Sequence, residues 1–335
     1  MTASPHTPVM LKEVLAALAP RDGGIYVDAT FGAGGYARAI LNAADCTVYG
    51  FDRDPTAIDR AKELTKQFAG RLILINRPFG EMREALEEAG VEVVDGVVFD
   101  LGVSSMHLDE AHRGFSFRYD GPLSMRMDLG KPDAADVIEK AEVRDLAAIF
   151  RSYGEEKRAG QLAKAIVAAR ETAPIKTTGR LAGIIESATP QSARKKIHPA
   201  TRAFQALRIF VNDELGQLVA GLRAAERLLR PAGRLVAVTF HSLEDRIVKR
   251  FLAGGEAAKG GGSRHLPPAD VAPLAFDLVY PKAIAASRNE AQENPRARSA
   301  KLRAGARTGA APLAIDEASL GLPKLLELSF LNGGV

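Results

Sequence analysis

A glycine-rich turn follows the first apolar strand signal and has the composition of a ligand-binding loop. Residues 25–27 are apolar, the stretch Asp28 to Gly35 reads DATFGAGG, and a helical pattern comes next. Glycines allow a tight turn and bring backbone amides close to a ligand. Glycine-rich turns also occur where a loop only joins a strand to a helix, so that alternative stays open.

The spacing of the glycines indicates a cofactor without a pyrophosphate. A dinucleotide site reads G-x-G-x-x-G, whereas here an acid and a threonine precede bunched glycines, which favours S-adenosylmethionine. A second apolar run ends at Asp52, about twenty residues further on, where nucleotide sites place the acid that binds a ribose. Asp52 is therefore the expected ribose ligand. Asp54 precedes Pro55 and is expected to cap the next helix.

Alternating strand and helix signals must position these residues. Strands are expected near residues 25–29, 47–52, 71–75 and 95–100, with helices between them, which predicts a doubly wound parallel sheet. Residues 106–212 then show helical periodicity without strands. The stop signal Pro231-Ala232-Gly233 precedes another strand, Leu235–Phe240, and a last strand is expected near 300–304. The α/β core, residues 1–105 and 213–335, is thus interrupted by an all-helical insert, 106–212.

Composition places few limits on function. The chain has 335 residues, a formal net charge of +4 and one cysteine, so its average charge says little about nucleic acid. Cys46 has no partner for a disulfide or a zinc site and is expected to be a small buried residue. No apolar run is long enough to span a bilayer, and the N-terminal residues do not resemble a signal peptide. We expect a soluble, cytoplasmic protein without a metal or a membrane partner.

Further candidates follow the later strands, because ligands collect at the carboxyl ends of parallel strands. Phe79 either covers an adenine or packs on the next helix. Asp100 either binds the cofactor, stabilises positive charge on a target amine, or caps a loop. His241 either accepts a proton or is a hydrogen-bonded core residue. Ser242 with Asp245 resembles a helix-capping pair.

Basic residues form two clusters that suit a phosphate backbone, although a solvated charged face is the alternative. A third segment, Arg113 to Tyr119, interleaves arginines with aromatic residues. It is either a platform on which bases stack or a hydrophobic plug that joins the insert to the core. The first cluster lies in the insert and the second near the C-terminus: Arg194, Lys195, Lys196, His198, Arg202 and Arg208; Arg296, Arg298, Lys301, Arg303 and Arg307.

The chain resembles the bacterial 16S ribosomal RNA cytosine-N4 methyltransferases, the RsmH family, formerly MraW. The resemblance covers nearly the whole chain. It rests on ordered motifs: His6-Thr7-Pro8-Val9, the turn to Gly35, Asp52-Arg53-Asp54-Pro55, Asp100-Leu101-Gly102-Val103-Ser104-Ser105, Arg113-Gly114-Phe115-Ser116-Phe117, Met125-Arg126-Met127-Asp128, His198-Pro199-Ala200-Thr201-Arg202, Phe240-His241-Ser242-Leu243-Glu244-Asp245-Arg246 and Asn294-Pro295-Arg296-Ala297-Arg298-Ser299.

The resemblance implies a class I methyltransferase (Rossmann-like) fold, with the insert as the RNA-substrate domain and a cytidine of the ribosomal decoding region as target. It also implies cofactor contacts from several residues at the strand ends. Three positions depart from the usual family pattern: Tyr36, Met106-His107 and Ser124. The implied contacts with S-adenosylmethionine are Gly34, Gly35, Tyr36, Asp52, Phe79, Asp100 and His107.

The sequence is also compatible with two other functions. One is a methyltransferase for DNA or a small amine. The other is a non-catalytic RNA-binding assembly factor, against which the glycine turn, Asp52 and Asp100 argue, because a binder need not keep a cofactor site. Asp100 and His241 are the candidate catalytic residues, and the candidate RNA contacts are Arg113, Lys195, Lys196, Arg202, Arg208, Arg296 and Arg298. The sequence does not define the oligomeric state, and a homodimer is one possible assembly.

Overall fold

The computed structural model describes residues 8–130, 132–191, 198–254, 273–312 and 315–323. These residues divide between two compact units. The first, the core unit, comes from Met1–Gly102 and Leu215–Leu322; the second, the insert unit, comes from Val103–Glu214 together with Pro323. The chain therefore leaves the core after the fourth strand and returns to it through a single long helix.

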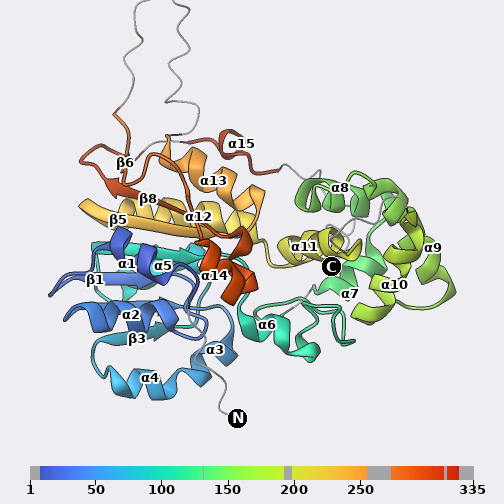
Figure 1. Cartoon of the computed structure of the whole chain (residues 1–335), viewed down its shortest axis with the longest axis horizontal. Coiled ribbons are helices and arrows are strands. Elements are labelled where there is room, and N and C mark those ends of the chain that lie inside the picture. Colours follow the sequence, from blue (N-terminus) through green and yellow to red (C-terminus); the bar gives the residue numbers. More distant parts are fainter. Residues whose placement is uncertain (1–7, 131, 192–197, 255–272, 313–314, 324–335) are drawn as a thin grey trace, which may run out of the picture. The chain divides into compact units, whose positions relative to one another are not determined.

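The core unit is built on an eight-stranded sheet with the order β3-β2-β1-β4-β5-β8-β6, and β7 pairs with β8 (Figure 1). The five strands β1 to β5 run parallel, whereas β6 and β7 each pair antiparallel with β8. The strands are β1 (Ile25–Asp28), β2 (Thr47–Phe51), β3 (Leu72–Ile75), β4 (Val94–Asp100), β5 (Leu229–Thr239), β6 (Phe276–Leu278), β7 (Ile284–Ala285) and β8 (Lys301–Arg307).

The Rossmann-like arrangement predicted from the sequence is confirmed, including the parallel pairing of its first strands, and the last strand, whose direction the sequence did not define, joins it antiparallel. β8 pairs antiparallel with β5, from Arg234 opposite Ala306 to Thr239 opposite Lys301. An antiparallel strand can join a sheet without the long crossover that each parallel strand requires. No strand was predicted at β6 and β7, which are only three and two residues long.

The helix ends just before the stop signal Pro231–Gly233, as predicted, but the strand that follows begins earlier than expected. The preceding helix ends at Leu228, and these residues lie inside β5, where the pairing with β4 is irregular. Ala232 has a φ of 67°, so the backbone turns locally while the strand continues. Such an irregularity lets proline and glycine occur within a strand that is otherwise apolar.

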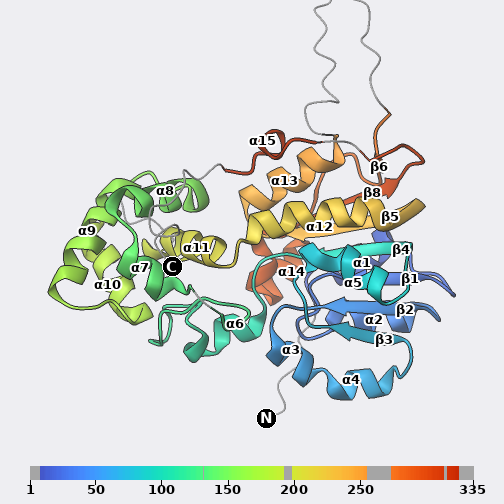
Figure 2. The ribbon, with the colours of Figure 1, turned by 180° about the vertical axis from the view of Figure 1, so that it is seen from behind.

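Helices cover both faces of the sheet. α1 and α2 lie over the face seen in Figure 1, and α5 and α12 over the face seen in Figure 2. No helix in the described ranges is long and apolar enough to cross a lipid bilayer. The helices are α1 (Leu11–Leu18), α2 (Gly35–Ala43), α3 (Pro55–Arg60), α4 (Lys62–Gln67), η1 (Phe79–Glu81), α5 (Met82–Glu88), α12 (Glu214–Leu228), α13 (Ser242–Leu252), α14 (Arg288–Glu293), η4 (Pro295–Ser299) and α15 (Glu317–Leu320).

The insert unit is helical over its described residues, apart from an isolated bridge between Pro122 and Thr177. Its helices pack around an apolar core that includes the fully buried Phe150 and Leu207. This helical insert was predicted from the lack of strand signals. Its helices are α6 (Ser105–Asp109), η2 (Ala111–Arg113), α7 (Ala134–Lys140), α8 (Val143–Gly154), α9 (Ala159–Thr172), α10 (Thr178–Ala188) and α11 (Ala200–Val211).

Candidate cofactor site at the carboxyl edge of the sheet

The glycine turn connects β1 to α2 and has the backbone conformation that its glycines predict. Gly32 and Gly34 have φ values of 52° and 74°, in the left-handed region that favours glycine. The amide of Phe31 donates a hydrogen bond of 2.8 Å to the carbonyl of Phe51, which fixes the turn against the end of β2. The turn therefore lies where the first two strands end.

Gly34 and Gly35 are also required by the protein's own packing. A Cβ atom at Gly34 would lie 2.5 Å from Cδ2 of Leu64, and one at Gly35 would lie 2.3 Å from Cγ of Pro8. Both glycines thus have a structural role that does not depend on a ligand. Their contact with a cofactor stays a prediction from the family pattern.

Asp28 links the turn to the first turn of α2. Its buried carboxylate accepts hydrogen bonds from the amide of Thr30 at 3.3 Å and the amide of Ala37 at 3.1 Å. It thereby supplies the cap that Gly34 cannot provide. Burial raises the pKa of the Asp28 carboxyl to about 7, and the charge of Asp52 adds to the rise. The sequence indicated Asp28 only as the end of a strand.

Asp52 joins the turn to the second strand. Its Oδ2 accepts a hydrogen bond of 2.8 Å from the amide of Gly32, and its Oδ1 accepts one of 2.8 Å from the amide of Asp54. Asp54 in turn caps α3 through the amide of Thr56 at 2.9 Å, which confirms its predicted role. Asp52 is therefore held at the edge of the turn, where a ribose ligand is expected.

Asp100 ends β4, beside β1, and its main chain is tied to the turn. The amide of Asp100 donates a hydrogen bond of 2.6 Å to Oγ1 of Thr30. Its side-chain Oδ1 is buried and has no hydrogen-bond partner among the described residues. Burial raises the pKa of this carboxyl to about 8, and the charges of Asp28 and Glu244 contribute further. A buried acceptor without a partner is uncommon in folded proteins and marks a place for a ligand.

Phe79 is half-buried at the start of η1, after β3. Its ring packs edge-to-face on Phe99 of β4, with centroids 5.5 Å apart. It also lies against α12, because a Cβ atom at Gly221 would be 2.6 Å from Cδ2 of Phe79. The ring is thus supported from the sheet and from α12, and coverage of an adenine by it stays a prediction.

Tyr36 lies in the first turn of α2 and is buried. Its hydroxyl donates a hydrogen bond to the carbonyl of Val9. Burial raises the pKa of this phenol well above its usual value, and nearby carboxylates, of which Asp100 contributes most, add to the rise. Since the hydroxyl is directed to Val9, a cofactor contact at this position would come from the backbone.

His241 forms the N-cap of α13, a role that the sequence analysis had given to Ser242. Its Nδ1 accepts a hydrogen bond of 3.4 Å from the amide of Glu244, and Glu244 Oε2 accepts one of 3.2 Å from the amide of His241. His241 Nε2 also lies 3.0 Å from Glu244 Oε1. The pair Ser242 with Asp245 was wrong because the helix begins at Ser242, one residue earlier than that pair requires. Asp245 instead binds Lys301 and Arg303.

His107 and the aromatic segment lie in the insert unit. The ring of His107 is buried and stacks on Phe115, with centroids 4.6 Å apart. Phe117 packs against His198 at 4.6 Å and against Phe204 at 4.9 Å. Phe115, Phe117 and Phe204 contribute to the insert's own apolar core, so these rings are packed and do not form an open stacking platform.

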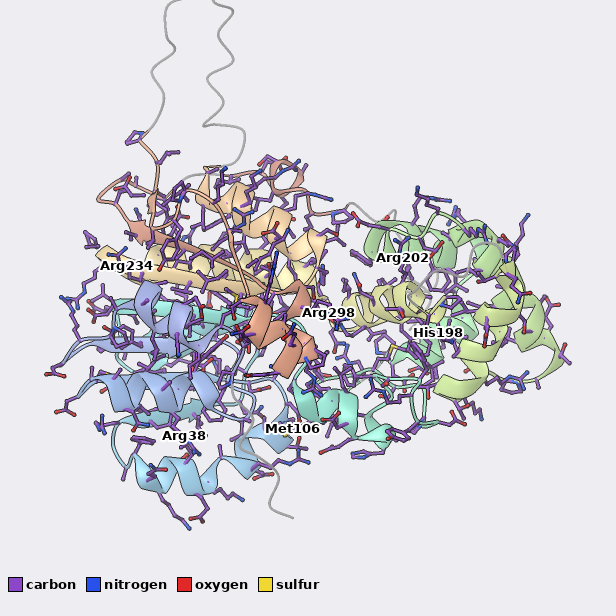
Figure 3. All side chains as sticks on the ribbon, in the orientation of Figure 1. Arg38, Met106, His198, Arg202, Arg234 and Arg298 are labelled. Atoms are coloured by element: carbon purple, nitrogen blue, oxygen red, sulfur yellow. The ribbon has the colours of Figure 1, made fainter. Side chains whose placement is uncertain are left out.

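The predicted RNA contacts differ in exposure. Arg113 is buried and donates to the carbonyls of Arg126 and Met127. Arg208 forms a bidentate ion pair with Glu214. Arg202 of α11 and Arg298 of η4 are exposed (Figure 3), and Arg296 is half-buried. Lys195 and Lys196, with Arg194, lie outside the described residues.

The strand order, the glycine turn and the acids that end β1, β2 and β4 define an α/β enzyme of the methyltransferase class. The family model described as the MraW methylase family matches residues 3–308. The chain belongs to this family, which confirms the resemblance inferred from its motifs.

Relatives match along nearly the full chain. "Ribosomal RNA small subunit methyltransferase H" of Parvibaculum lavamentivorans is 57% identical over 320 residues, covering 96% of this chain and 94% of the relative. The protein of the same name from Nitrobacter hamburgensis is 54% identical over 336 residues, covering 100% of both. An rRNA methylase structure from Streptococcus thermophilus aligns with 91% of this chain and 99% of that one, at 11% identity and with a TM-score of 0.40.

Proposed function

We propose that this protein transfers a methyl group from S-adenosylmethionine to the N4 atom of a cytidine in the decoding region of small-subunit ribosomal RNA. The family and the names of its relatives support small-subunit rRNA as the substrate. The choice of cytidine N4 rests on the motif resemblance. The single structural observation that carries the proposal is the buried, unpartnered Oδ1 of Asp100 at the end of β4, judged over the described residues.

The carboxyl edge suits S-adenosylmethionine in its charge and its hydrogen-bonding groups. This cofactor is cationic at its sulfonium and ammonium groups, and Asp100 offers a buried carboxyl oxygen that the protein itself does not use within the described residues. The carboxylate of Asp52 accepts hydrogen bonds from the amides of Gly32 and Asp54, which hold it at the turn where a ribose hydroxyl is expected. We assign the cofactor to Asp52 and Asp100, together with Gly34, Gly35, Tyr36, Phe79 and His107.

The cofactor, when bound, supplies an electrophilic methyl group, and the protein must prepare the amine. The exocyclic N4 of cytosine is a poor nucleophile because its lone pair is delocalised into the ring. Ionised Asp100 would accept a hydrogen bond from this amine and stabilise the positive charge that develops on it. Orientation of the amine contributes further, once the cytidine is extruded from its stack.

Asp100 is a better proton acceptor than His241. Nδ1 of His241 accepts from the amide of Glu244, so in the neutral ring the proton resides on Nε2, next to the carboxylate of Glu244. Nδ1 of His241 could accept a proton only if it lost the hydrogen bond from the amide of Glu244, which caps the helix. Asp100 has an oxygen whose lone pairs no described residue engages.

The test is methylation of defined substrates with labelled S-adenosylmethionine. Unmodified small-subunit rRNA, free or assembled with its proteins, is compared with DNA of matched sequence, and the products are digested to nucleosides. We expect N4-methylcytidine at one site in rRNA only. Label in DNA would support a methyltransferase of another substrate. Absence of cofactor binding by calorimetry would support a non-catalytic assembly factor.

Exposed basic residues of both units are proposed to contact the rRNA backbone, in particular Arg202 and Arg298.

We place the protein in the cytoplasm, where ribosomal subunits are assembled. A homodimer also stays a proposal, and sedimentation of the purified protein with and without cofactor tests it.

A further inference from the structure

The residues before α1 are fastened to the first turn of α2. The ring of Pro8 occupies the space over Gly35, since a Cβ atom at Gly35 would lie 2.3 Å from its Cγ. The hydroxyl of Tyr36 donates a hydrogen bond to the carbonyl of Val9. Val9 and Tyr36 are both buried. The segment Pro8–Met10 therefore covers the helix that the glycine turn starts.

The same segment is fastened at its other end to α14. The amide of Met10 donates a hydrogen bond of 2.6 Å to Oε1 of Glu290. Met10 has a φ of 53°, an unfavourable conformation for a residue with a side chain, and it persists only when neighbouring contacts hold it. Glu290 is itself placed by the cap of its helix, because its amide donates to Oγ of Ser287 at 3.1 Å.

α14 leads into the basic segment Asn294–Ser299, which contains Arg296 and Arg298. β8 follows, and its first residue, Lys301, pairs with Thr239 at the carboxyl end of β5. This segment therefore lies at the same edge of the sheet as the glycine turn, and both views show α14 at that edge (Figures 1 and 2). Ala297 of the segment shares one apolar cluster with Met10 and Tyr36.

We propose that Tyr36 and Glu290 are positioning residues that hold Pro8–Met10 as a bridge between the cofactor turn and the basic Asn294–Ser299 segment. The inference deepens the proposed function and rests on it. Release of the bridge would loosen α2 at its N-terminus and free α14 from the core. Cofactor affinity and rRNA affinity would then fall together, and binding of one ligand would no longer favour the other.

The experiment compares Glu290→Ala, Glu290→Gln and a matched control, Glu293→Gln, which removes an exposed charge from the same helix. Calorimetry with S-adenosylhomocysteine, with and without rRNA, is run well below the unfolding temperature. Loss of a charge-assisted hydrogen bond predicts about a tenfold weaker cofactor affinity for Glu290→Ala. Glu290→Gln should recover most of it, because its amide oxygen can accept the same bond. The control should match the wild type.

Tyr36→Phe removes only the hydroxyl and keeps the buried ring, so it tests the other end of the bridge. Its effect should be in the same direction, and the double variant with Glu290→Ala should be less impaired than the two single effects predict together, because both act on one segment. Wild-type cofactor affinity in Glu290→Ala and Tyr36→Phe would overturn the proposal, as would additive effects. If Glu290→Ala does not fold, the cofactor affinities of Tyr36→Phe and Glu290→Gln test the proposal in its place. Failure of the wild type to methylate rRNA would instead refute the proposed function.

Discussion

Two charged residues that the sequence singled out, Asp100 in the core unit and Arg113 in the insert unit, have different surroundings. At the carboxyl edge of the core unit, Asp100 keeps a buried oxygen without a partner in the described structure, and the pKa of its carboxyl is raised to about 8. In the insert unit, Arg113 donates to main-chain carbonyls and Arg208 is paired with Glu214. The insert thus uses for its own folding several groups that the sequence marked as ligand contacts.

This difference shows how a site is distinguished from a structural network. A buried polar group without a hydrogen bond costs folding free energy, so its presence requires a reason outside folding. A buried arginine with carbonyl partners, such as Arg113, needs no ligand to explain it. Residue type alone therefore does not mark a binding site, and a buried carboxyl oxygen without a described partner adds evidence that residue type lacks.

The largest effect should come from Asp100→Asn, which keeps the size of the side chain and removes its charge. We expect single-turnover methylation to fall by about a hundredfold to a thousandfold, because electrostatic stabilisation at the amine is lost. The matched control is Asp277→Asn, at an exposed acid on β6, which should leave the rate unchanged. A wild-type methylation rate in Asp100→Asn would show that the unpartnered oxygen of Asp100 has no part in catalysis.

Arg113→Ala should destabilise the insert unit by about 3 kcal/mol, because the carbonyls of Arg126 and Met127 lose a buried donor. Arg202→Ala is the exposed counterpart and should change stability by less than about 0.5 kcal/mol. Its rRNA affinity should instead fall, with a shallower salt dependence. Chemical denaturation measures the stability of each variant, and rRNA binding at several salt concentrations measures its affinity, so the structural role and the binding role are distinguished. A stable Arg113→Ala protein with weakened rRNA binding would show that the buried arginine is a ligand contact.

Cofactor affinity should rise with pH up to about 8. The carboxyl of Asp100, with its pKa raised to about 8, is protonated at lower pH, and a cationic ligand favours its ionised form. Affinity should therefore weaken by up to about tenfold for each unit of pH below 8. Calorimetry from pH 6 to 9 measures this, and Asp100→Asn should show a flat profile.

The ligand-free protein should show the opposite trend in stability. Since the pKa of the Asp28 carboxyl is raised to about 7 and that of Asp100 to about 8, the folded state binds more protons than the unfolded state. Stability should then fall as pH rises from about 4 to 8, by linkage. A melting temperature that rises across this range would contradict the raised pKa values.

The smallest effect on catalysis is expected for His241→Ala. The variant loses the N-cap of α13, which costs about 1 kcal/mol of stability. Single-turnover methylation of assembled small subunits should stay close to the wild-type rate. A loss of about a hundredfold with unchanged stability would restore His241 as the proton acceptor.

Much of the core unit could be predicted from short-range patterns. The first four strands, the cap at Asp54 and the positive φ values of the glycine turn follow from apolar runs and from glycine, whose effects act within a few residues. The antiparallel β8 and the continuation of β5 through Pro231 could not be predicted, because strand direction and pairing depend on distant segments.

The sequence by itself determined the family, the first strands of a Rossmann-like core, the helical insert and the set of candidate residues. Only the tertiary structure decided which of these residues have unused hydrogen-bonding capacity. Asp100 and Arg113 are both charged residues within family motifs, yet one retains a buried oxygen without a described partner and the other binds carbonyls inside the insert. Hydrogen-bond partners and burial arise from contacts between segments far apart in the chain, which no local pattern encodes.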